Sequence, residues 1–433
     1  MRYKRGIATV ICALFAAVTL VSGCANQAQI YLDKGNNYYA KKQWDAAIAN
    51  YTIATELAPN NAEGFFNRGL VYHQKSNYEK AIADYTRAID LDPKNARAYY
   101  YRGVVYDYKG EYGMSIDDYT KAIDLNPKFA DAYKNRGNAY YKLKEYVKAA
   151  DDSTKVIELN PKNADAYYNR GIARSYNGEY DKAIIDYTRA IDLDPKNTLF
   201  YYSRGVAYDN KGKYDEAFAD FNKAIEIEPQ NAWAYYNRGV SYINKGEYDK
   251  AIADCTKAID LDSRNAEFYN NRGLAYYHKK NYDKAIGDYT RALELDPKDA
   301  DTYKNLGSAY KILGEYSKAV ADFTRAIDLN PKDAEAYYNR GVAYSYNGEY
   351  DKSIADYTRA IDLNPKDAWS FFNRGVDYDN KGEYDKAIAD FNKAIEIEPK
   401  NAEFYYSRGI TYNNNGENDK SVADFNRARE LGY

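Results

Sequence analysis

Proline recurs in this chain at one fixed spacing, and that spacing limits what the chain can fold into. Successive prolines are 34 residues apart, or twice that distance where Ser263 replaces one: Pro59, Pro93, Pro127, Pro161, Pro195, Pro229, Pro297, Pro331, Pro365 and Pro399. Glycine repeats at the same interval, from Gly35 to Gly409. A period of this length is typical of stacked helical or strand units, each of which buries its apolar face only against its neighbours. Twelve units without insertion run from residue 26 to 433.

Each unit holds two helical patterns. In the first half of a typical unit, Tyr167 and Gly171 stand four residues apart on one helix face, and in the second half Ala183 and Tyr187 do the same. Asn163 is placed to cap the first helix. Pro195 ends the second, because proline lacks an amide donor and the residue before it avoids the helical region. The small residues leave room for the partner helix, so each unit is predicted to be a helical hairpin.

This arrangement resembles the tetratricopeptide repeat: an aromatic residue, glycine and tyrosine in the first helix, then alanine, an aromatic residue, alanine and proline. The resemblance covers residues 28–433. It implies an all-α fold, a right-handed α-solenoid of twelve 34-residue helix-turn-helix repeats. It also implies a concave groove lined by the first helix of each pair.

The first residues predict export and a lipid anchor. Residues 1–23 begin with Arg2, Lys4 and Arg5, and the apolar run that follows is shorter than a membrane-spanning helix needs. The run ends in Leu-Val-Ser-Gly-Cys24, which resembles the bacterial lipobox and implies lipidation of Cys24. Residues 24–27 would form a short tether. By resemblance to envelope lipoproteins of Gram-negative bacteria, Ala25 favours the outer membrane, facing the periplasm. An ordinary signal peptide with an incidental cysteine is the alternative.

Composition argues against several function classes. The formal net charge is -3 and no basic stripe occurs, which disfavours nucleic-acid binding. Cys255 is the one cysteine of the predicted solenoid, where it replaces a core aromatic residue and is expected to be buried. His73 and His278 have no Cys or His at metal-ligand spacing. We therefore expect no catalytic residues, no metal and no cofactor, and predict that the chain is not an enzyme.

A recurring arginine just before the glycine suggests structural ion pairs with recurring aspartates. Arg68, Arg102 and Arg136 would pair with Asp84, Asp118 and Asp152, and the series continues to Arg408. Capture of a peptide by these arginines is the alternative. Leu306 interrupts the series in the ninth repeat.

Candidate binding residues lie on the face that the family turns toward its groove. Tyrosine fills one register there, at Tyr100, Tyr168, Tyr202, Tyr236, Tyr338 and Tyr406. Tyrosine is enriched at binding hot spots, although the same rings could pack between neighbouring hairpins. Lys134, Asn138 and Asn169 match part of the clamp by which some tetratricopeptide domains hold a terminal carboxylate. The clamp is incomplete, because Leu199 and Ser203 stand where the family would have Lys and Arg.

A longer period of five repeats is superimposed on the short one. The segment 175–182 returns as 345–352, and Lys134-Asn135 returns as Lys304-Asn305. This duplication could supply two similar binding surfaces, or only length.

Together these features predict a non-enzymatic scaffold, lipid-anchored to the bacterial envelope, that binds other proteins or peptides in a Tyr-rich groove. It could serve envelope assembly or the recruitment of cell-wall enzymes. The rival interpretation is a carbohydrate-binding or surface-exposed adhesion lipoprotein, with the tyrosines stacking on sugar rings.

Overall fold

The computed structural model describes residues 26–433, and within that range every regular element is an α-helix. Residues 26–40 are helical and pair with the next helix, so that the described chain forms twelve helical hairpins. The predicted all-α solenoid of twelve repeats is confirmed. The predicted signal peptide and Cys24 lie outside the described residues. No helix within residues 26–433 is both long and apolar enough to cross a membrane.

The later hairpins begin with a first helix of 13 residues. These helices are α3 (Ala62–Gln74), α5 (Ala96–Tyr108), α7 (Ala130–Lys142), α9 (Ala164–Tyr176), α11 (Thr198–Asn210), α13 (Ala232–Asn244), α15 (Ala266–His278), α17 (Ala300–Ile312), α19 (Ala334–Tyr346), α21 (Ala368–Asn380) and α23 (Ala402–Asn414). The second helices are α2 (Trp44–Leu57), α4 (Tyr78–Leu91), α6 (Tyr112–Leu125), α8 (Tyr146–Leu159), α10 (Tyr180–Leu193), α12 (Tyr214–Ile227), α14 (Tyr248–Leu261), α16 (Tyr282–Leu295), α18 (Tyr316–Leu329), α20 (Tyr350–Leu363), α22 (Tyr384–Ile397) and α24 (Asn418–Glu430).

The helix ends follow the local chemistry of the sequence. Asn163 caps α9 as predicted, because its side-chain oxygen accepts a hydrogen bond of 3.1 Å from the amide of Ala166. α10 ends at Leu193, two residues before Pro195. The turn inside that hairpin passes through Gly178 at φ +77°, a left-handed conformation that glycine adopts without steric cost.

The core of each hairpin is a glycine on the first helix packed against an aromatic ring on the second. A methyl group added to Gly171 would meet the ring of Tyr187 at 2.6 Å, so no larger residue fits there without movement. Tyr187 itself is buried. Cys255 occupies the same register in the seventh repeat and is fully buried, as the sequence predicted, and burial raises the pKa of its thiol to about 12.

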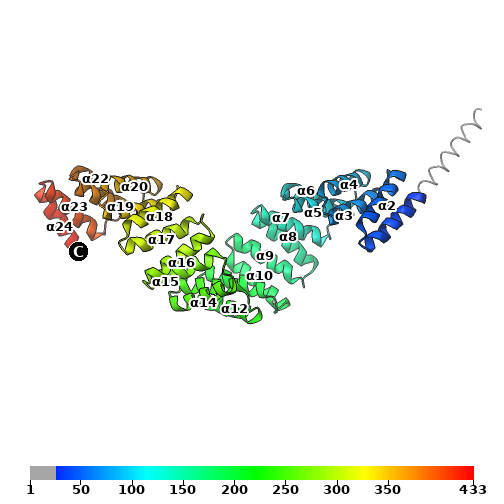
Figure 1. Ribbon diagram of the computed structural model, residues 1–433, viewed down its shortest axis with the longest axis horizontal. Coiled ribbons are helices and arrows are strands. Elements are labelled where there is room, and N and C mark those ends of the chain that lie inside the picture. Colours follow the sequence, from blue (N-terminus) through cyan, green and yellow to red (C-terminus); the bar gives the residue numbers. More distant parts are fainter. Residues whose placement is uncertain (1–25) are drawn as a thin grey trace, which may run out of the picture. The chain divides into compact units, whose positions relative to one another are not determined.

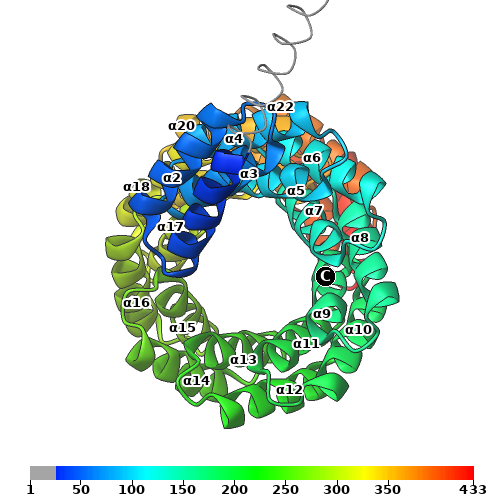
Figure 2. The ribbon, with the colours of Figure 1, turned by 90° about the vertical axis from the view of Figure 1, so that its right-hand side faces the viewer.

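The chain divides into two compact units, residues 26–216 and 217–433. Within each unit the helices pack on their neighbours in sequence, and successive first helices also touch (Figure 1). Figure 2 shows α5, α7 and α9 on the inner side of the first unit and α6, α8 and α10 on its outer side. In the second unit α13, α15 and α17 lie inside and α14, α16 and α18 outside. The inner face of each unit is therefore built by first helices, as the resemblance implied.

Candidate protein-binding grooves

The tyrosines predicted to line the groove lie on first helices and are half-buried. The ring of Tyr100 lies 4.7 Å from Phe129 in the next repeat and 5.8 Å from Tyr119 in its own second helix, measured between ring centroids. Tyr168 lies 5.1 Å from Phe200 and 5.9 Å from Tyr187 in the same way. The two interpretations of this register are therefore compatible, because these rings both pack between hairpins and border the inner face.

The other members of the register have similar surroundings. Tyr236 lies 5.0 Å from Phe268, Tyr338 lies 6.0 Å from Tyr357, and Tyr406 stacks on Tyr433 at 4.1 Å. Tyr202 is half-buried on α11.

A polar side chain from the next repeat holds many of these hydroxyls. The Nδ2 atoms of Asn135, Asn271 and Asn373 donate to the hydroxyls of Tyr100, Tyr236 and Tyr338 at 3.1, 2.9 and 3.0 Å, and Ser203 Oγ donates to Tyr168 at 3.4 Å. Burial raises the pKa of Tyr100 to about 12. Its hydroxyl therefore keeps its proton near neutral pH and can still donate to a ligand.

A pocket of about 590 Å³ opens on the first unit, between α5 and α7. Tyr100, Val104, Tyr108 and Asn135 contribute to its lining, together with Arg97, Phe129 and Asp131. A second pocket, of about 610 Å³, opens on the second unit across α19, α21 and the start of α23. Its lining includes Tyr338, Val342, Tyr346, Trp369, Phe372, Asn373 and Glu403. Both volumes fall in the range of ligand sites, and both linings combine aromatic rings with a few polar groups.

The two pockets occupy the same place in the repeat, seven repeats apart. Tyr338, Val342, Tyr346 and Asn373 are the equivalents of Tyr100, Val104, Tyr108 and Asn135, with the same hydrogen bond from asparagine to tyrosine. This relation differs from the five-repeat duplication, which pairs Tyr338 with Tyr168. The recurrence indicates that the shape of the pocket follows from the geometry of the repeat. The lining residues that differ between the two pockets determine which ligand each pocket can bind.

The residues of the partial carboxylate clamp come together only in part. Lys134 and Asn169 both line a small cavity of about 30 Å³ between α7 and α9, which Ser153 also lines. Ser153 stands where neighbouring repeats carry a buried aromatic ring, so the cavity exists because that ring is missing. Asn138 is exposed on α7 and does not line this cavity. A space of this size holds about one water molecule.

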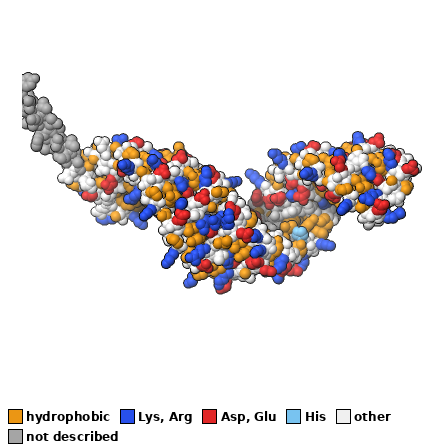
Figure 3. Space-filling model, turned by 180° about the vertical axis from the view of Figure 1, so that it is seen from behind, with side chains coloured by type: hydrophobic (Ala, Val, Ile, Leu, Met, Phe, Trp, Pro, Cys, Tyr) orange, Lys and Arg blue, Asp and Glu red, His pale blue; other side chains and the backbone are white. Residues whose placement is uncertain are grey.

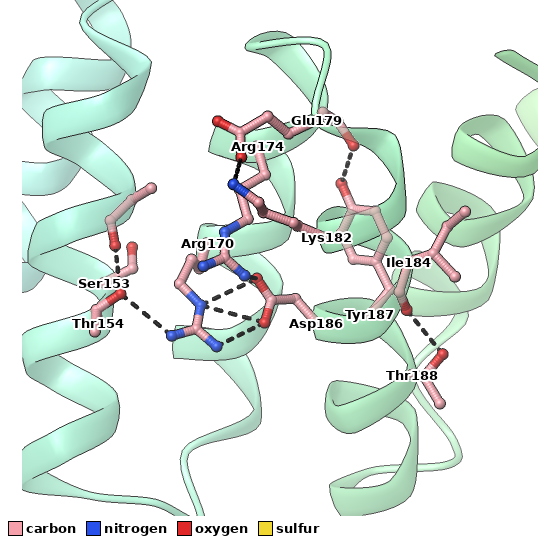
Figure 4. Close-up of polar contacts among 12 residues, drawn as sticks. Ser153, Thr154, Arg170, Arg174, Glu179, Lys182, Ile184, Asp186, Tyr187 and Thr188 are labelled. Carbon is pink, nitrogen blue, oxygen red and sulfur yellow. Dashed lines mark hydrogen bonds and ion pairs between the residues drawn. The ribbon is translucent and has the colours of Figure 1, made fainter. Parts of the chain in front are cut away.

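The arginine register forms the predicted ion pairs. Arg102 makes a two-point contact with Asp118, its Nε and Nη2 donating at 2.8 and 2.7 Å, and its Nη1 donates to Thr86 of the preceding repeat at 2.9 Å. In the fifth repeat Arg170 and Arg174 both donate to the buried carboxylate of Asp186, and Arg170 reaches Thr154 (Figure 4). The planar Arg–Asp pairs join the two helices of one hairpin, and the bonds to Thr86 and Thr154 join that hairpin to the preceding one, which explains the recurrence structurally.

The histidines lie among aromatic rings. His73 is half-buried with its ring centroid 5.5 Å from that of Tyr108, and burial lowers its pKa. His278 is exposed and stacks on Tyr248. Across residues 26–433 no group of three or more His, Cys, Asp or Glu side chains is placed to hold a metal ion.

Sequence reasoning missed Trp369, Glu403 and Asp377, although Trp369 and Asp377 depart from their registers. Asp377 stands where other repeats carry a small or aliphatic residue such as Ala343. Trp369 replaces residues that are mostly charged. A comparison of each register across the repeats would have singled out both residues, but not their position beside one pocket.

Basic and acidic side chains are interspersed over the face seen in Figure 3, with hydrophobic side chains between them. That face offers no continuous basic field for a nucleic-acid backbone.

Sequence models of the tetratricopeptide repeat match residues 96–197, 232–299 and 334–367 in 34-residue copies. Related models described as TPR or tetratricopeptide repeat match the intervening segments, so that residues 35–431 are covered. No curated protein matches the chain in sequence.

Three solved structures illustrate what this chain is similar to in fold. YrrB, described as a TPR protein with an unusual peptide-binding site, is 25% identical over 42% of this chain and 95% of its own, with a TM-score of 0.37. MamA is 29% identical over 39% of this chain and 92% of its own, with a TM-score of 0.36. Yeast Tom70 is 17% identical over 93% of this chain and 95% of its own, with a TM-score of 0.44.

Proposed function

The chain belongs to the tetratricopeptide repeat family, and on that premise we propose that it is a non-enzymatic scaffold that binds segments of other proteins along the inner faces of its two units. The observation that carries the proposal is the pair of aromatic pockets on first helices, seven repeats apart and alike in lining. Rings that are already held by packing and by asparagine lose little freedom on binding, which favours capture of a partner side chain.

The test uses pocket aromatics that are exposed, because their loss should leave the fold intact. Tyr108 and Tyr346 line the two pockets and are 67% and 69% exposed. Replacing both by alanine should weaken capture of partners from an envelope extract about tenfold or more, as for binding hot spots, and leave the thermal melt nearly unchanged. The matched control is Ile185→Ala on the outer helix α10, which is 67% exposed. Equal capture by the double variant and the control would contradict the proposal.

Carbohydrate binding is the competing function, since exposed aromatic rings also stack on sugars. The same capture experiment separates the two classes when it is repeated after digestion of peptidoglycan. Retention of protein partners after digestion supports the scaffold. Loss of every protein partner, together with binding of the soluble glycan fragments, supports carbohydrate binding.

We further propose that the scaffold is held at the bacterial envelope through a lipid on Cys24, facing the periplasm from the outer membrane. The support is the lipobox-like segment 20–24, and multiple acyl chains on one residue would give stable anchoring. Cys24→Ala should abolish incorporation of a radioactive fatty acid and release the chain from the membrane fraction. A variant that still carries label and still sediments with membranes would overturn the anchor.

A further inference from the structure

The two equivalent pockets differ in charge. The first is lined by Arg97 and Asp131, which carry opposite charges. In the second, Trp369 takes the place of Asp131, Glu403 is added from α23, and no Lys, Arg or His contributes to the lining (α19 to α23, Figure 1). The carboxylate of Glu403 makes no ion pair within the described residues. The second pocket is therefore aromatic and acidic, whereas the first has a balanced charge.

A buried carboxyl group is joined to the lining of this second pocket by a hydrogen bond. Asp377 on α21 is fully buried, and it accepts a hydrogen bond of 2.6 Å from Ser345, a residue of the pocket lining. It also accepts from Ser353 of α20. No cationic side chain pairs with Asp377 among residues 26–433, and burial raises its pKa. A buried carboxyl group without a cation is costly in its charged form, so a positive charge entering the pocket would stabilise it.

The aromatic rings supply the second element of cation recognition. Trp369 packs edge-on against Phe372 and Phe404, with ring centroids 5.4 and 5.3 Å apart, and remains 36% exposed. Tyr346 stacks on Tyr316 at 5.2 Å and is 69% exposed. An ammonium or guanidinium group near the face of such rings is attracted by their quadrupole, most strongly for tryptophan.

We propose that the pocket formed by Tyr346, Trp369 and Glu403 binds a Lys or Arg side chain of an extended partner segment. The inference rests on the proposed scaffold function and gives the chemistry of one contact. The aromatic faces and the Glu403 carboxylate receive the cationic head, and Asn373 and Ser345 border the space for the backbone and stem. The equivalent pocket of the first unit, with Arg97 in its lining, disfavours the same side chain.

The experiment uses the full chain and fluorescent peptides of one neutral Ser/Ala host sequence that carry Lys, Arg, norleucine or Glu at a single central position. Fluorescence anisotropy gives the dissociation constant of each. The Lys and Arg peptides should bind about tenfold more tightly than the norleucine peptide, and added salt should reduce the difference. Glu403→Gln and Trp369→Ala should each remove most of the preference. Trp369→Phe keeps an aromatic ring in the pocket, and it serves as a second variant in case Trp369→Ala does not fold.

The matched control is Asp385→Asn, an exposed carboxylate on the second helix α22 that lines neither pocket, which should leave the preference unchanged. Norleucine binding as tight as Lys binding, or a preference that survives Glu403→Gln, overturns the inference. Failure of all four peptides to bind, while partner capture still depends on Tyr108 and Tyr346, also overturns it but leaves the scaffold proposal intact. A Lys preference without any partner capture has the opposite meaning, because the pocket assignment then stands and the scaffold proposal fails.

Discussion

Tyr85 and Tyr187 occupy the same register in two hairpins, yet their hydroxyls have different partners. The hydroxyl of Tyr187 lies 3.2 Å from Ser175 Oγ, whereas the hydroxyl of Tyr85 is buried without any hydrogen-bond partner. Four other repeats carry Phe at this place, including the fully buried Phe221 and Phe323. Because each residue of a repeat has equivalents in the other repeats, the same substitution at two equivalent positions gives one variant and its control.

Tyr85→Phe should raise the free energy of unfolding by about 1 kcal/mol, because a buried hydroxyl without a partner costs roughly 1–3 kcal/mol. Tyr187→Phe should lower it by about 0.5–1.5 kcal/mol, because that hydroxyl loses its bond to Ser175. Urea unfolding followed by circular dichroism measures both. Equal destabilisation by the two changes would show that the hydroxyl of Tyr85 has a stabilising role.

Asp322 should make the second unit less stable as pH rises from about 4 to 6. Leu306 replaces the arginine that pairs with this register elsewhere, and burial raises the pKa of Asp322 to about 6. The folded state therefore binds the proton more tightly than the unfolded state, and ionisation penalises folding. The stability gained by Asp322→Asn should grow between pH 4 and 6 and then level off. Its control, Asp356→Asn, should destabilise at neutral pH, because it removes the partner of Arg340. A pH-independent gain would contradict this account.

At the scale of the element, the turn inside each hairpin needs one residue in the left-handed region. Gly178 and most of its copies supply it, but Lys42, Ser76, Lys144 and Lys280 hold the same conformation at φ +57° to +62°. A residue with a Cβ pays roughly 1–2 kcal/mol there. In these hairpins the second helix begins two residues after the left-handed residue, as it does after Gly178, so the strain is confined to the turn.

Lys144→Gly should therefore stabilise the fourth hairpin by about 1 kcal/mol, and Gly178→Lys should destabilise the fifth by a similar amount. Amide hydrogen exchange in α8 and α10 reports each hairpin separately. No gain in protection for the glycine variant would mean that the side chain of Lys144 compensates the backbone strain.

At the scale of the whole molecule, each helix within residues 26–433 packs mainly on the helices next to it in the chain, and first helices of successive hairpins also touch. Stability is then close to a sum of hairpin terms and interface terms. A chain shortened to end at Pro229, after α12, should keep the circular dichroism per residue of the full chain and unfold at a lower urea concentration. Collapse of the helical signal would contradict this modular picture and would indicate that the first unit depends on the second.

The sequence by itself determined everything that a single repeat encodes. It gave the 34-residue period, the Asn163 cap, the helix end before Pro195, the glycine that faces Tyr187, and the Arg–Asp pairs such as Arg102 with Asp118, because each depends on residues at fixed short spacing. The tyrosine register was found in the same way. The sequence alone did not show that these tyrosines both pack between hairpins and border the pockets.

Only the tertiary structure decided which departures from the repeat meet in space. One pocket is lined by residues of three successive hairpins: Ser345 and Tyr346 on α19, Trp369 on α21 and Glu403 on α23. Asp377 is hydrogen-bonded to Ser345 of that lining. Lys134 and Asn169 face one small cavity because Ser153 is short. The physical reason is that a register fixes which face of a helix a residue occupies, whereas the distance between faces of different hairpins is set by how their side chains pack.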